Sequence, residues 1–569
     1  MKKHNKYNTE VTGAEALILS LLDENVNDIF GYPGGAIMPI YDALYDYMDQ
    51  LNHYLVRHEQ GAIHAAQGYS RVSGRPGVVF ATSGPGATNL ITGIADAQID
   101  STPLVCITGQ VASHLLGTDA FQETDVVGIS MPVTKWNIQV TKAEEIAPAI
   151  AKAFYIATTG RPGPVLVDIT KDAQFGKTNY EYKKCESIRS YFPHPKINVD
   201  EIKKAAELIN NAKRPFILCG HGVLLSSAER QLLAFAEKAD IPVASTLLGL
   251  SAFPPQHPLY VGYLGMHGNY GPNLMTNKCD VLIAIGMRFD DRVTSNVSKY
   301  AKQAKVIHFE IDPSEINKII PADIAILGDA KEALDLLLPE IKTQKRKEWL
   351  QGFDECNKIE YEKVIKNAVD PESEKLRMAE VIDKFHKISQ GNAIVVTDVG
   401  QHQMITSRYY KFNEPNHLVT SGGLGTMGFG LPAAIGAKVA KPNEDVVAVL
   451  GDGGFQMTIQ ELGTIMQSNI AVKILVLNNN FLGMVRQWQQ LFFDRRYSFT
   501  EMKNPDFIAI AKGYGITGKK ITKRKDLQEA IFEMLESKDA FILEVVVENE
   551  DNVFPMVATG ASVSEITLE

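Results

Sequence analysis

Two short strands with polar residues at their ends carry the clearest chemical signal in the sequence. The run VVAVL at 446–450 is β-branched and apolar, as buried parallel strands are, and it leads into a Gly-Asp-Gly triplet around Asp452. Glycines there predict a tight turn that lets the backbone approach a ligand closely. The next strand, VKILVLN at 472–478, runs into the asparagines at 478–480. One carboxylate with amide and backbone oxygens suits a hard divalent cation that keeps water and phosphate oxygens as its other ligands.

A helix between the two strands is needed to bring these groups together. Residues 456–468 have helical spacing, and the apolar side chains that share one face are Ile459, Leu462, Ile465 and Met466. Both strands of a strand–helix–strand unit end at the same edge of a sheet, so Asp452 is expected close to the asparagines. An α/β crossover with a merely polar turn would show the same pattern, and other parts of the chain must decide.

Glu59 is the second residue whose setting suggests chemistry. It follows the predicted strand YLVRH at 54–58 and opens a nearly uncharged helix. A lone carboxylate is expensive to desolvate in such a place unless it has a partner or a task. Glu59 is therefore either a helix N-terminal glutamate favoured by the dipole or a group that takes part in proton transfer.

Composition limits the kind of protein and its partners. A chain of 569 residues with 45% hydrophobic residues predicts a globular protein of three or four domains. A net charge of 57 − 67 = −10 disfavours nucleic acid and leaves no basic patch for a membrane surface. Five scattered cysteines without a CxxC pair are typical of a reduced, cytoplasmic protein. No apolar run approaches the ~18 residues of a membrane span, and the polar start resembles no secretory signal.

Strand and helix patterns alternate through three blocks, which predicts an α/β fold of three doubly wound parallel-sheet domains. The expected domains cover residues 9–180, 195–345 and 376–548, and a weakly patterned acidic tail, mobile or a lid, covers 549–569. The first and third blocks have similar lengths and patterns, which suggests two related domains that face each other. The middle block either binds a nucleotide at its strand ends or is a degenerate domain that binds nothing. Residues 343–375, rich in Lys and Glu, are predicted to be a solvated linker with helical character.

The triplet at 451–453, followed after 24 residues by Asn-Asn, resembles the Mg²⁺–diphosphate motif of thiamine-diphosphate enzymes. Nearly the whole chain resembles the catalytic large subunits of the acetohydroxyacid synthase (acetolactate synthase) family, in its biosynthetic, FAD-containing type. The motifs that carry the resemblance are GYPGGAI (31–37), RHEQGA (57–62), SGPGATN (83–89), AFQETD (120–125), RPGPVLVD (161–168), MRFDDRV (287–293), SGGLGTMGFG (421–430) and NNNFLGMVRQW (478–488).

The resemblance implies a site for thiamine diphosphate and Mg²⁺ between a pyrimidine-binding N-terminal domain and a diphosphate-binding C-terminal domain. Glu59 would hydrogen-bond the aminopyrimidine ring, where it acts as an acid/base switch. The metal ligands would be Asp452, Asn479 and the backbone carbonyl of Phe481. The cofactor would further contact Gln401, His402, Gly425, Met427 and Gly453. The residues expected to line the substrate funnel are Phe121, Gln122 and Lys171.

The resemblance also implies an FAD in the central domain that performs no net redox chemistry. The residues that match its binding segments are Arg161, His267, Gly268, Arg288, Asp312 and Asp329. Arg292 and Trp488 match residues that favour 2-oxobutyrate as the acceptor. A packed aromatic, a solvated lysine or a core methionine would be the ordinary alternative role for several of these side chains.

The implied activity is the condensation of two 2-oxo acids with loss of CO₂. Pyruvate with pyruvate would give 2-acetolactate, and pyruvate with 2-oxobutyrate would give 2-aceto-2-hydroxybutyrate, the first common step of branched-chain amino-acid synthesis. A homodimer or homotetramer is expected because the two halves of the cofactor site should meet across subunits. A small regulatory subunit is a further expected partner.

Other functions fit parts of the sequence. Pyruvate oxidase, a 2-oxo acid decarboxylase, a flavin-free catabolic acetolactate synthase and glyoxylate carboligase are alternatives within the superfamily, and the intact Glu59 disfavours the last. Gly423, Gly425 and Gly428 spell GxGxxG, a weak signal for a dinucleotide dehydrogenase that explains neither Glu59 nor the metal motif. A catalytically inactive scaffold is disfavoured by the intact Glu59, Asp452 and Asn479.

Overall fold

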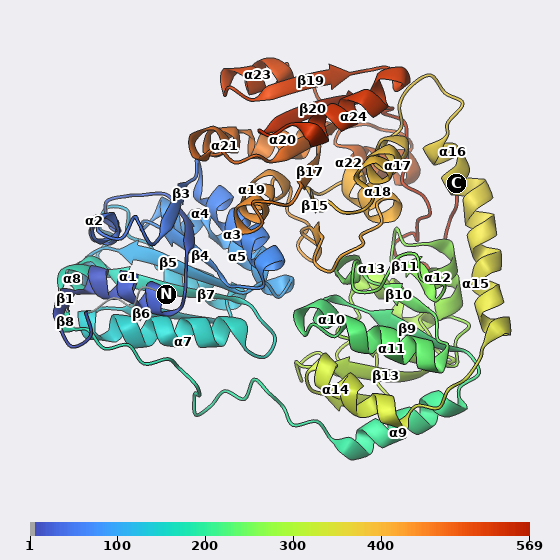
Figure 1. Ribbon diagram of the computed structural model, residues 1–569, viewed down its shortest axis with the longest axis horizontal. Coiled ribbons are helices and arrows are strands. Elements are labelled where there is room, and N and C mark those ends of the chain that lie inside the picture. The colour runs from blue at the N-terminus through green and yellow to red at the C-terminus, as the bar shows by residue number, and fades with distance from the viewer. Residues whose placement is uncertain (1–5) are drawn as a thin grey trace.

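The computed structural model describes residues 6–569, and residues 1–5, part of the polar start considered above, lie outside the described residues. The chain forms three lobes, each built on a six-stranded parallel sheet. In Figure 1 the N-terminal lobe lies at the left, the middle lobe at the lower right and the C-terminal lobe at the top. The α/β fold class predicted from the sequence is confirmed.

The two terminal sheets have the same topology. The N-terminal sheet has the order β3-β2-β4-β5-β7-β6 and the C-terminal sheet the order β16-β15-β17-β18-β20-β19, so corresponding strands occupy corresponding places. The N-terminal strands are β2 Asp28–Gly31, β3 Asn52–Leu55, β4 Gly77–Ala81, β5 Leu104–Gln110, β6 Trp136–Val140 and β7 Pro164–Thr170. The C-terminal strands are β15 Ile394–Thr397, β16 Leu418–Val419, β17 Val446–Gly451, β18 Lys473–Asn478, β19 Thr517–Ile521 and β20 Phe541–Val546. This shared topology supports the idea that the two domains are related.

The middle sheet has the order β11-β10-β9-β12-β13-β14, which is the doubly wound order of dinucleotide-binding domains. Its strands are β9 Pro215–Cys219, β10 Val243–Ser245, β11 Tyr260–Tyr263, β12 Val281–Ile285, β13 Lys305–Glu310 and β14 Ile324–Leu327. In such sheets the strand order reverses between the first and fourth strands, here β9 and β12, and ligands bind outside the strand ends at that point. A short antiparallel pair, β1 Glu10–Thr12 with β8 Lys177–Asn179, closes the N-terminal lobe.

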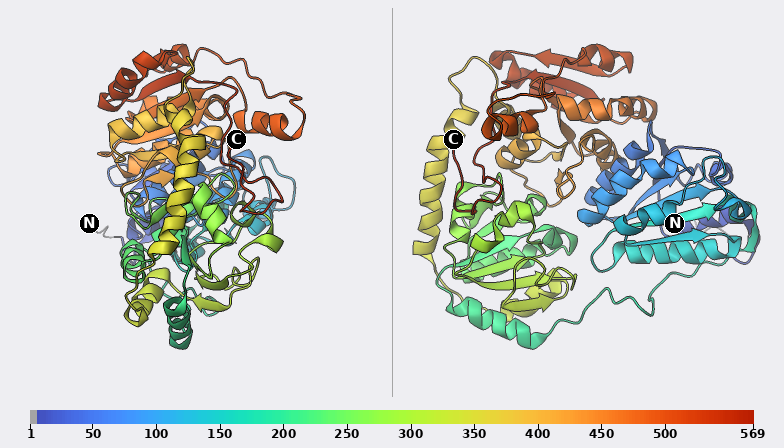
Figure 2. Two further views of the ribbon diagram at one scale, coloured as in Figure 1. Left: turned by 90° about the vertical axis from the view of Figure 1, so that its right-hand side faces the viewer. Right: turned by 180° about the vertical axis from the view of Figure 1, so that it is seen from behind.

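Helices cover both faces of each sheet, as Figures 1 and 2 show. The helices of the N-terminal lobe are α1 Gly13–Asp23, α2 Met38–Tyr45, α3 Glu59–Ser73, α4 Pro85–Asn89, α5 Ile91–Ile99, α6 Val126–Ser130, α7 Ile146–Thr158 and α8 Lys171–Phe175. The middle lobe has α9 Val199–Asn211, α10 His221–Leu225, α11 Glu229–Ala239, α12 Tyr270–Thr276, α13 Asp291–Thr294 and α14 Ala330–Leu337. The C-terminal lobe has α17 Met378–Ser389, α18 Gln401–Tyr409, α19 Gly430–Ala440, α20 Asp452–Met457, α21 Leu462–Ser468, α22 Gly483–Phe492, α23 Phe507–Gly513 and α24 Leu527–Glu536.

Helices α3 and α19 join the N-terminal and C-terminal lobes at van der Waals distance. A Cβ on Gly68 would lie 1.9 Å from the carbonyl oxygen of Ala433, and a Cβ on Gly436 would lie 1.7 Å from that of Ala65. Only glycine allows two helix backbones to approach this closely. The helix that begins with Glu59 is thereby fixed against the C-terminal lobe.

Three expectations about the elements need correction. The predicted helix at 456–468 begins earlier, at Asp452, and is interrupted at Thr458 before α21, because the chain turns there through a 3₁₀ segment. Met466, expected on the buried face, is 48% exposed, whereas Leu462 and Ile465 of the same helix are buried as expected. The residues expected in a tight turn, Gly451–Gly453, are the last residue of β17 and the first turn of α20.

The segment 343–375 is only partly the solvated linker that its charges predicted. It forms α15 Lys347–Glu360 and α16 Lys366–Val369, which stand beside the middle and C-terminal lobes in Figure 1. Trp349, Phe353 and Cys356 are buried in the core of the middle lobe, because one apolar stripe runs along an otherwise charged helix.

The acidic tail, expected to be mobile or a lid, packs against the middle lobe in this structure. The amide of Val557 donates to the carbonyl oxygen of Met266 at 2.8 Å, and Ser295 Oγ donates to the carbonyl oxygen of Ala561 at 2.9 Å. Val563 is buried in the core of the middle lobe. Across residues 6–569 no helix is both long and apolar enough to cross a membrane.

Candidate cofactor and active site

The residues of the predicted metal motif meet at the carboxyl ends of β17 and β18. Asp452 is 1% exposed, and burial raises the pKa of its carboxyl to about 6. The Asn504 side-chain amide donates to Asp452 Oδ2 at 2.6 Å, to Asn478 Oδ1 at 3.0 Å and to Asn480 Oδ1 at 3.1 Å. Three oxygens therefore converge on one donor, which is the kind of environment that a cation favours.

Asn479 and the start of α18 complete this half of the site. Asn479 donates to Gln401 Oε1 at 3.3 Å, and its own Oδ1 accepts from the amide of Phe481 at 3.1 Å. His402 is buried against Gly451, where a Cβ would lie 2.8 Å from the ring. A Cβ on Gly453 would lie 2.8 Å from Leu482 and 3.6 Å from Met427. The structure thus brings together the predicted metal ligands and most of the predicted diphosphate contacts.

This cluster fits a divalent cation that is shared with a diphosphate. The Nε2 atom of His402 is buried without a hydrogen-bond partner, and an incoming acceptor would satisfy it. Burial lowers the pKa of His402 to about 3, so the ring is neutral. Within residues 6–569 no three His, Cys, Asp or Glu side chains are grouped as metal ligands, so a cation here would depend on one carboxylate and neutral oxygens.

Glu59 lies in the N-terminal lobe, at the first position of α3. Its side chain is 9% exposed, and Asn89 donates to Oε2 at 2.9 Å. A Cβ on Gly86 would lie 3.2 Å from Oε1, so the SGPG segment leaves space around this carboxylate. Glu59 and Asp452 lie in different lobes, and none of the contacts among the described residues joins them.

The three predicted funnel residues all lie in the N-terminal lobe. Phe121 is 87% exposed, and Gln122 has a left-handed backbone with φ of 61°. The carbonyl oxygen of Gln122 would lie 2.5 Å from a Cβ on Gly84, so this loop lies next to the segment around Glu59. Lys171 begins α8 at the end of β7.

A cavity of about 830 Å³ lies where the three lobes meet. Its lining includes eight of the predicted cofactor and substrate residues, namely Arg161, His267, Arg288, Arg292, Asp329, Gly425, Met427 and Trp488. Asp312 and Gly268 do not line it. Asp312 instead accepts from Arg161, a lining residue, at 3.2 Å. The carbonyl of Gly268, which follows the lining residue His267, accepts from Arg408 at 3.1 Å.

The cavity fits an elongated nucleotide cofactor. It opens at the ends of β9 and β12, where a Cβ on Gly286 would lie 2.6 Å from the Cα of Gly222, so two backbones meet without side chains. His267 Nδ1 is buried without a partner, and burial lowers the pKa of this ring to about 4. The Arg288 charge lies near the Asp290 carboxylate, but no hydrogen bond engages its side chain within residues 6–569, which leaves its N–H donors available to an anion. The Asp329 carboxylate already caps α14, since it accepts from the amides of Lys331 and Glu332.

The burial of Glu310 in the cavity wall leads us to expect that the stability of the cofactor-free protein depends on pH. Burial raises the pKa of this 8% exposed carboxyl from 4.5 to about 7, despite the amide donors of Ile311 and Asp312. A raised pKa contributes stability that is full below pH ~4.5 and is lost as pH rises through ~7, about 3 kcal/mol in all.

We therefore expect Glu310→Gln to raise the melting temperature relative to wild type more at pH 8 than at pH 5. Glu315→Gln is the control, because hydrogen bonds and ion pairs with Lys318 and Arg161 lower the pKa of Glu315 despite its burial, so this carboxylate stays charged at both pH values and its loss should shift the melting temperature about equally at both. Equal melting-temperature differences at the two pH values would show that Glu310 does not titrate in this range.

Several residues that shape the site have no recognisable spacing in the sequence. Asn504 and Asn89 hold the carboxylates of Asp452 and Glu59, but each reaches its partner only through the tertiary fold. Asp398, fully buried at the end of β15, accepts from the amides of Gly428 and Gly430 and holds the turn after Met427. The only sequence signal for a role of Asp398 is that it directly follows the apolar strand β15.

Comparisons with known proteins agree with this architecture. Residues 11–129 match the thiamine pyrophosphate enzyme N-terminal TPP binding domain, residues 202–337 the central domain and residues 398–545 the C-terminal TPP binding domain. The chain is 45% identical to an acetolactate synthase large subunit of Buchnera aphidicola (subsp. Schizaphis graminum), over 98% of both chains. It is 43% identical to the acetolactate synthase isozyme 3 large subunit of Escherichia coli K12, again over 98% of both. It is 46% identical to a probable acetolactate synthase large subunit of Methanocaldococcus jannaschii, over 97% of this chain and 95% of that one.

Similarity of this extent covers all three lobes and both halves of the predicted site. Two of the matched domains are thiamine pyrophosphate binding domains, and they contain Glu59 in one case and Asp452 with Asn479 in the other. The chain therefore belongs to the family of acetolactate synthase large subunits.

Proposed function

We propose that this chain condenses two molecules of 2-oxo acid with release of CO₂, giving 2-acetolactate from pyruvate alone or 2-aceto-2-hydroxybutyrate when 2-oxobutyrate is the acceptor. The observation that carries the proposal is the buried cluster of Asp452, Asn479 and Gln401 at the strand ends of a thiamine pyrophosphate binding domain. Thiamine diphosphate supplies an electron sink that accepts the bonding electrons when CO₂ leaves.

The protein's own residues would bind and orient the cofactor and shield its reactive carbon from water. Glu59 would accept or hold a proton at the ring nitrogen of the aminopyrimidine, and Asn89 fixes its carboxylate by one hydrogen bond. Met427 and Trp488 line the cavity and would keep water from a reactive carbon, where protonation would waste the first substrate. Phe121, Gln122 and Lys171 would contribute from the N-terminal lobe.

Mg²⁺ and FAD are the further cofactors of this proposal. Asp452, Asn479 and the carbonyl of Phe481 would hold Mg²⁺, which neutralises diphosphate charge. The cavity at the ends of β9 and β12 would hold FAD, with Arg288 and Arg161 as its cations and His267 beside it. FAD would stabilise the middle domain and its contacts without net redox change.

The place of Glu59 and Asp452 in different lobes is compatible with a homodimer or homotetramer in which each cofactor lies between two subunits. The relatives are named large subunits, which supports a small regulatory subunit as a further partner. The described cysteines are all free, which supports the cytoplasm as the location.

A product assay tests the function directly. Purified protein is incubated with pyruvate, thiamine diphosphate and Mg²⁺, with and without FAD, and acetolactate is converted by acid to acetoin. We expect acetoin only when all three cofactors are present. Acetoin without FAD would indicate a catabolic type, and acetaldehyde or peroxide in place of acetoin would refute the condensation.

Asp452→Ala is expected to abolish metal-dependent retention of the cofactor. The variant removes the single carboxylate among neutral oxygens, and losing a charged ligand costs well over tenfold in affinity. Equilibrium dialysis of thiamine diphosphate with and without Mg²⁺ measures the effect. Asp506→Ala is the control, because Asp506 caps a helix of the same domain, α23. Wild-type retention in Asp452→Ala would remove Asp452 from the metal site.

Trp488→Leu is expected to reduce the preference for 2-oxobutyrate over pyruvate by about tenfold or more, since filling a pocket around one methyl group is worth that much. Trp488 is 38% exposed and lines the cavity together with Arg292. The ratio of the two products formed from mixed acceptors measures the preference. An unchanged ratio with an active enzyme would show that Trp488 does not contact the acceptor.

A further inference from the structure

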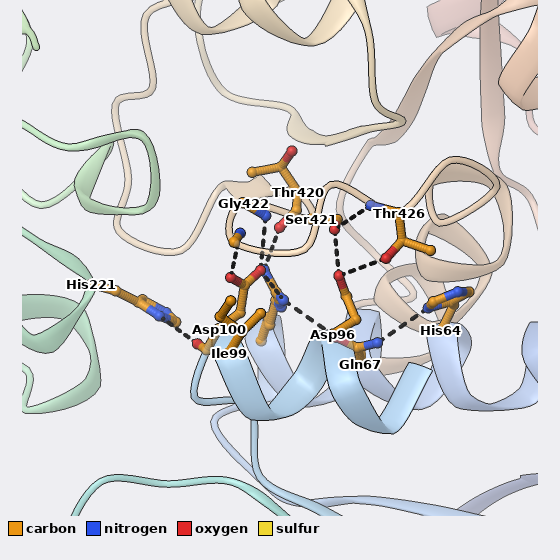
Figure 3. Close-up of polar contacts among 12 residues, drawn as sticks. His64, Gln67, Asp96, Ile99, Asp100, His221, Thr420, Ser421, Gly422 and Thr426 are labelled. Atoms are coloured by element: carbon orange, nitrogen blue, oxygen red, sulfur yellow. Dashed lines mark hydrogen bonds and ion pairs between the residues drawn. The ribbon is translucent and has the colours of Figure 1, made fainter. Parts of the chain in front are cut away.

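The loop that carries Gly425 and Met427 is held by a different lobe from its own. Asp100, at the end of α5 in the N-terminal lobe, accepts from the amide of Gly423 at 2.7 Å and from that of Gly422 at 2.8 Å. Its two carboxylate oxygens thus bind two successive backbone amides of the C-terminal lobe, as Figure 3 shows for Gly422. Charge-assisted bonds of this kind are about twice as strong as neutral ones.

Arg71 closes the contact from a second helix. Its guanidinium donates to Asp100 Oδ2 at 2.9 Å and to the carbonyl oxygen of Thr420, and it lies near the end of α3. The Arg71 and Asp100 side chains are 7% and 0% exposed. A buried carboxylate without a partner would be strongly unfavourable, so the ion pair and the loop amides depend on one another.

Asp96, one turn earlier on α5, binds the two ends of the same loop. Its Oδ1 accepts from the hydroxyl of Ser421 and, at 3.0 Å, from that of Thr426 (Figure 3). Ser421 Oγ in turn accepts from the amide of Thr426 at 2.8 Å. Asp96 therefore draws the two ends of the loop together, with Gly425 in the segment between them.

The middle lobe joins the same junction. His221, the first residue of α10 and part of the cavity wall, has Nδ1 3.1 Å from the carbonyl oxygen of Asp100. Burial lowers the pKa of His221 to about 4, so a neutral ring donates this hydrogen bond through Nδ1–H. All three lobes thus contact one another through the residues at the end of α5.

We propose that Asp100, Arg71 and Asp96 are positioning residues, which hold loop 420–427 in the conformation that receives thiamine diphosphate. The loop contains no regular structure, and Gly425 and Gly428 have φ of 70° and 89°, so its backbone alone would sample many conformations. Ordering it in advance removes that entropic cost from cofactor binding. The part of this inference that concerns the cofactor rests on the proposed function, and the part that concerns the loop does not.

The test compares Asp100→Asn with Asp280→Asn. Asp280 is the matched control, because its carboxylate also binds two successive amides, those of Lys213 and Arg214 at 2.8 and 2.9 Å, but inside the middle lobe. Amide hydrogen exchange of the whole protein is followed by mass spectrometry, and the dissociation constant of thiamine diphosphate is measured at saturating Mg²⁺. Asparagine can accept from only one of the two amides and places a donor against the other.

We expect Asp100→Asn to speed exchange in 420–427 by about tenfold or more and to weaken thiamine diphosphate binding by about tenfold. The KM for pyruvate at saturating cofactor should stay at the wild-type value. Asp280→Asn should speed exchange at 213–214 only and leave cofactor affinity unchanged. If Asp100→Asn fails to fold, Arg71→Lys serves in its place, because lysine keeps the charge but cannot bridge Asp100 and Thr420 as the guanidinium does.

Unchanged exchange in 420–427 in a folded Asp100→Asn or Arg71→Lys protein would overturn the inference, and so would faster loop exchange with unchanged cofactor affinity. Equal loosening of the loop in Asp280→Asn would show a general loss of stability in place of a local role. If wild-type protein forms no acetolactate and binds no thiamine diphosphate while the loop responds as expected, the proposed function fails and the structural junction stands.

Discussion

Glu59→Gln is expected to slow exchange of the C2 proton of bound thiamine diphosphate by about 10²–10⁴-fold, the usual contribution of a positioned acid–base group. Glutamine keeps the shape of the side chain and can still pair with Asn89, so folding and cofactor affinity should change little. Loss of the carboxylate removes the group that favours the proton shift within the aminopyrimidine. Quenched-flow deuterium exchange read by NMR measures the rate, and acetolactate formation should fall in proportion.

Glu461→Gln is the matched control for this experiment. Glu461 is also a buried carboxylate next to α3, and its oxygens accept from the amide of Arg57 at 3.1 and 3.2 Å. It joins the lobes and is not assigned to the cofactor, so its loss should affect stability and leave exchange of the bound cofactor near the wild-type rate. Exchange at the wild-type rate in Glu59→Gln, or an equal loss in Glu461→Gln, would contradict the role of Glu59.

The sequence predicts much of this fold because strand and helix alternate in long, strongly patterned blocks. The strands β17 and β18 are continuous apolar runs, so their positions and the meeting of Asp452 with the asparagines follow from topology alone. The helix between them was placed less well, since the interruption at Thr458 depends on how the chain packs against the rest of the domain and not on periodicity.

Only the site residues that belong to local sequence motifs could be predicted from the sequence. Gly-Asp-Gly and the asparagines signal a cation site, whereas Asn504 contributes its amide from a loop 52 residues after Asp452, a contact that no local pattern encodes. The pairing of Asp100 with Gly422 and Gly423 joins positions more than 320 residues apart in different lobes. The only local sign of this pairing is that Asp96 and Asp100 lie one turn apart at the end of α5, among mostly uncharged residues. Glu59 also lies in a nearly uncharged helix, but for a different reason.

The α15 helix shows how composition can mislead. Its charges predict a solvated linker, yet Glu360 and Arg408 form an ion pair in which both side chains are 1% exposed, and Asn269 donates to Glu360 at 2.8 Å. Arg408 also donates to the carbonyls of His267 and Gly268, so the pair supports the cavity wall. Charge counts describe a helix on average, whereas one buried pair depends on its position in the fold.

Gly436→Ala is expected to destabilise the contact between the N-terminal and C-terminal lobes by about 3 kcal/mol or more, toward the upper end of overpacking effects. The new Cβ would lie 1.7 Å from the carbonyl oxygen of Ala65 on α3, and backbone cannot move aside as a flexible side chain can. The two helices would have to separate, which would disturb Glu59 at one end of α3 and Arg71 near the other. Hydrogen exchange of α3 and α19 in the folded protein measures the loosening directly.

Gly513→Ala isolates the steric effect. Both glycines lie in helices, where alanine is intrinsically favoured by about 1 kcal/mol, but no atom lies within 4 Å of a Cβ on Gly513. Gly513→Ala should therefore be neutral or stabilising and leave exchange in α3 and α19 unchanged. If Gly436→Ala behaved in the same way, the close crossing of α3 and α19 would not be what fixes the helix of Glu59 against the C-terminal lobe. Gly68→Ala, with its Cβ 1.9 Å from the carbonyl oxygen of Ala433, should repeat the loss from the other helix, because both glycines serve one contact.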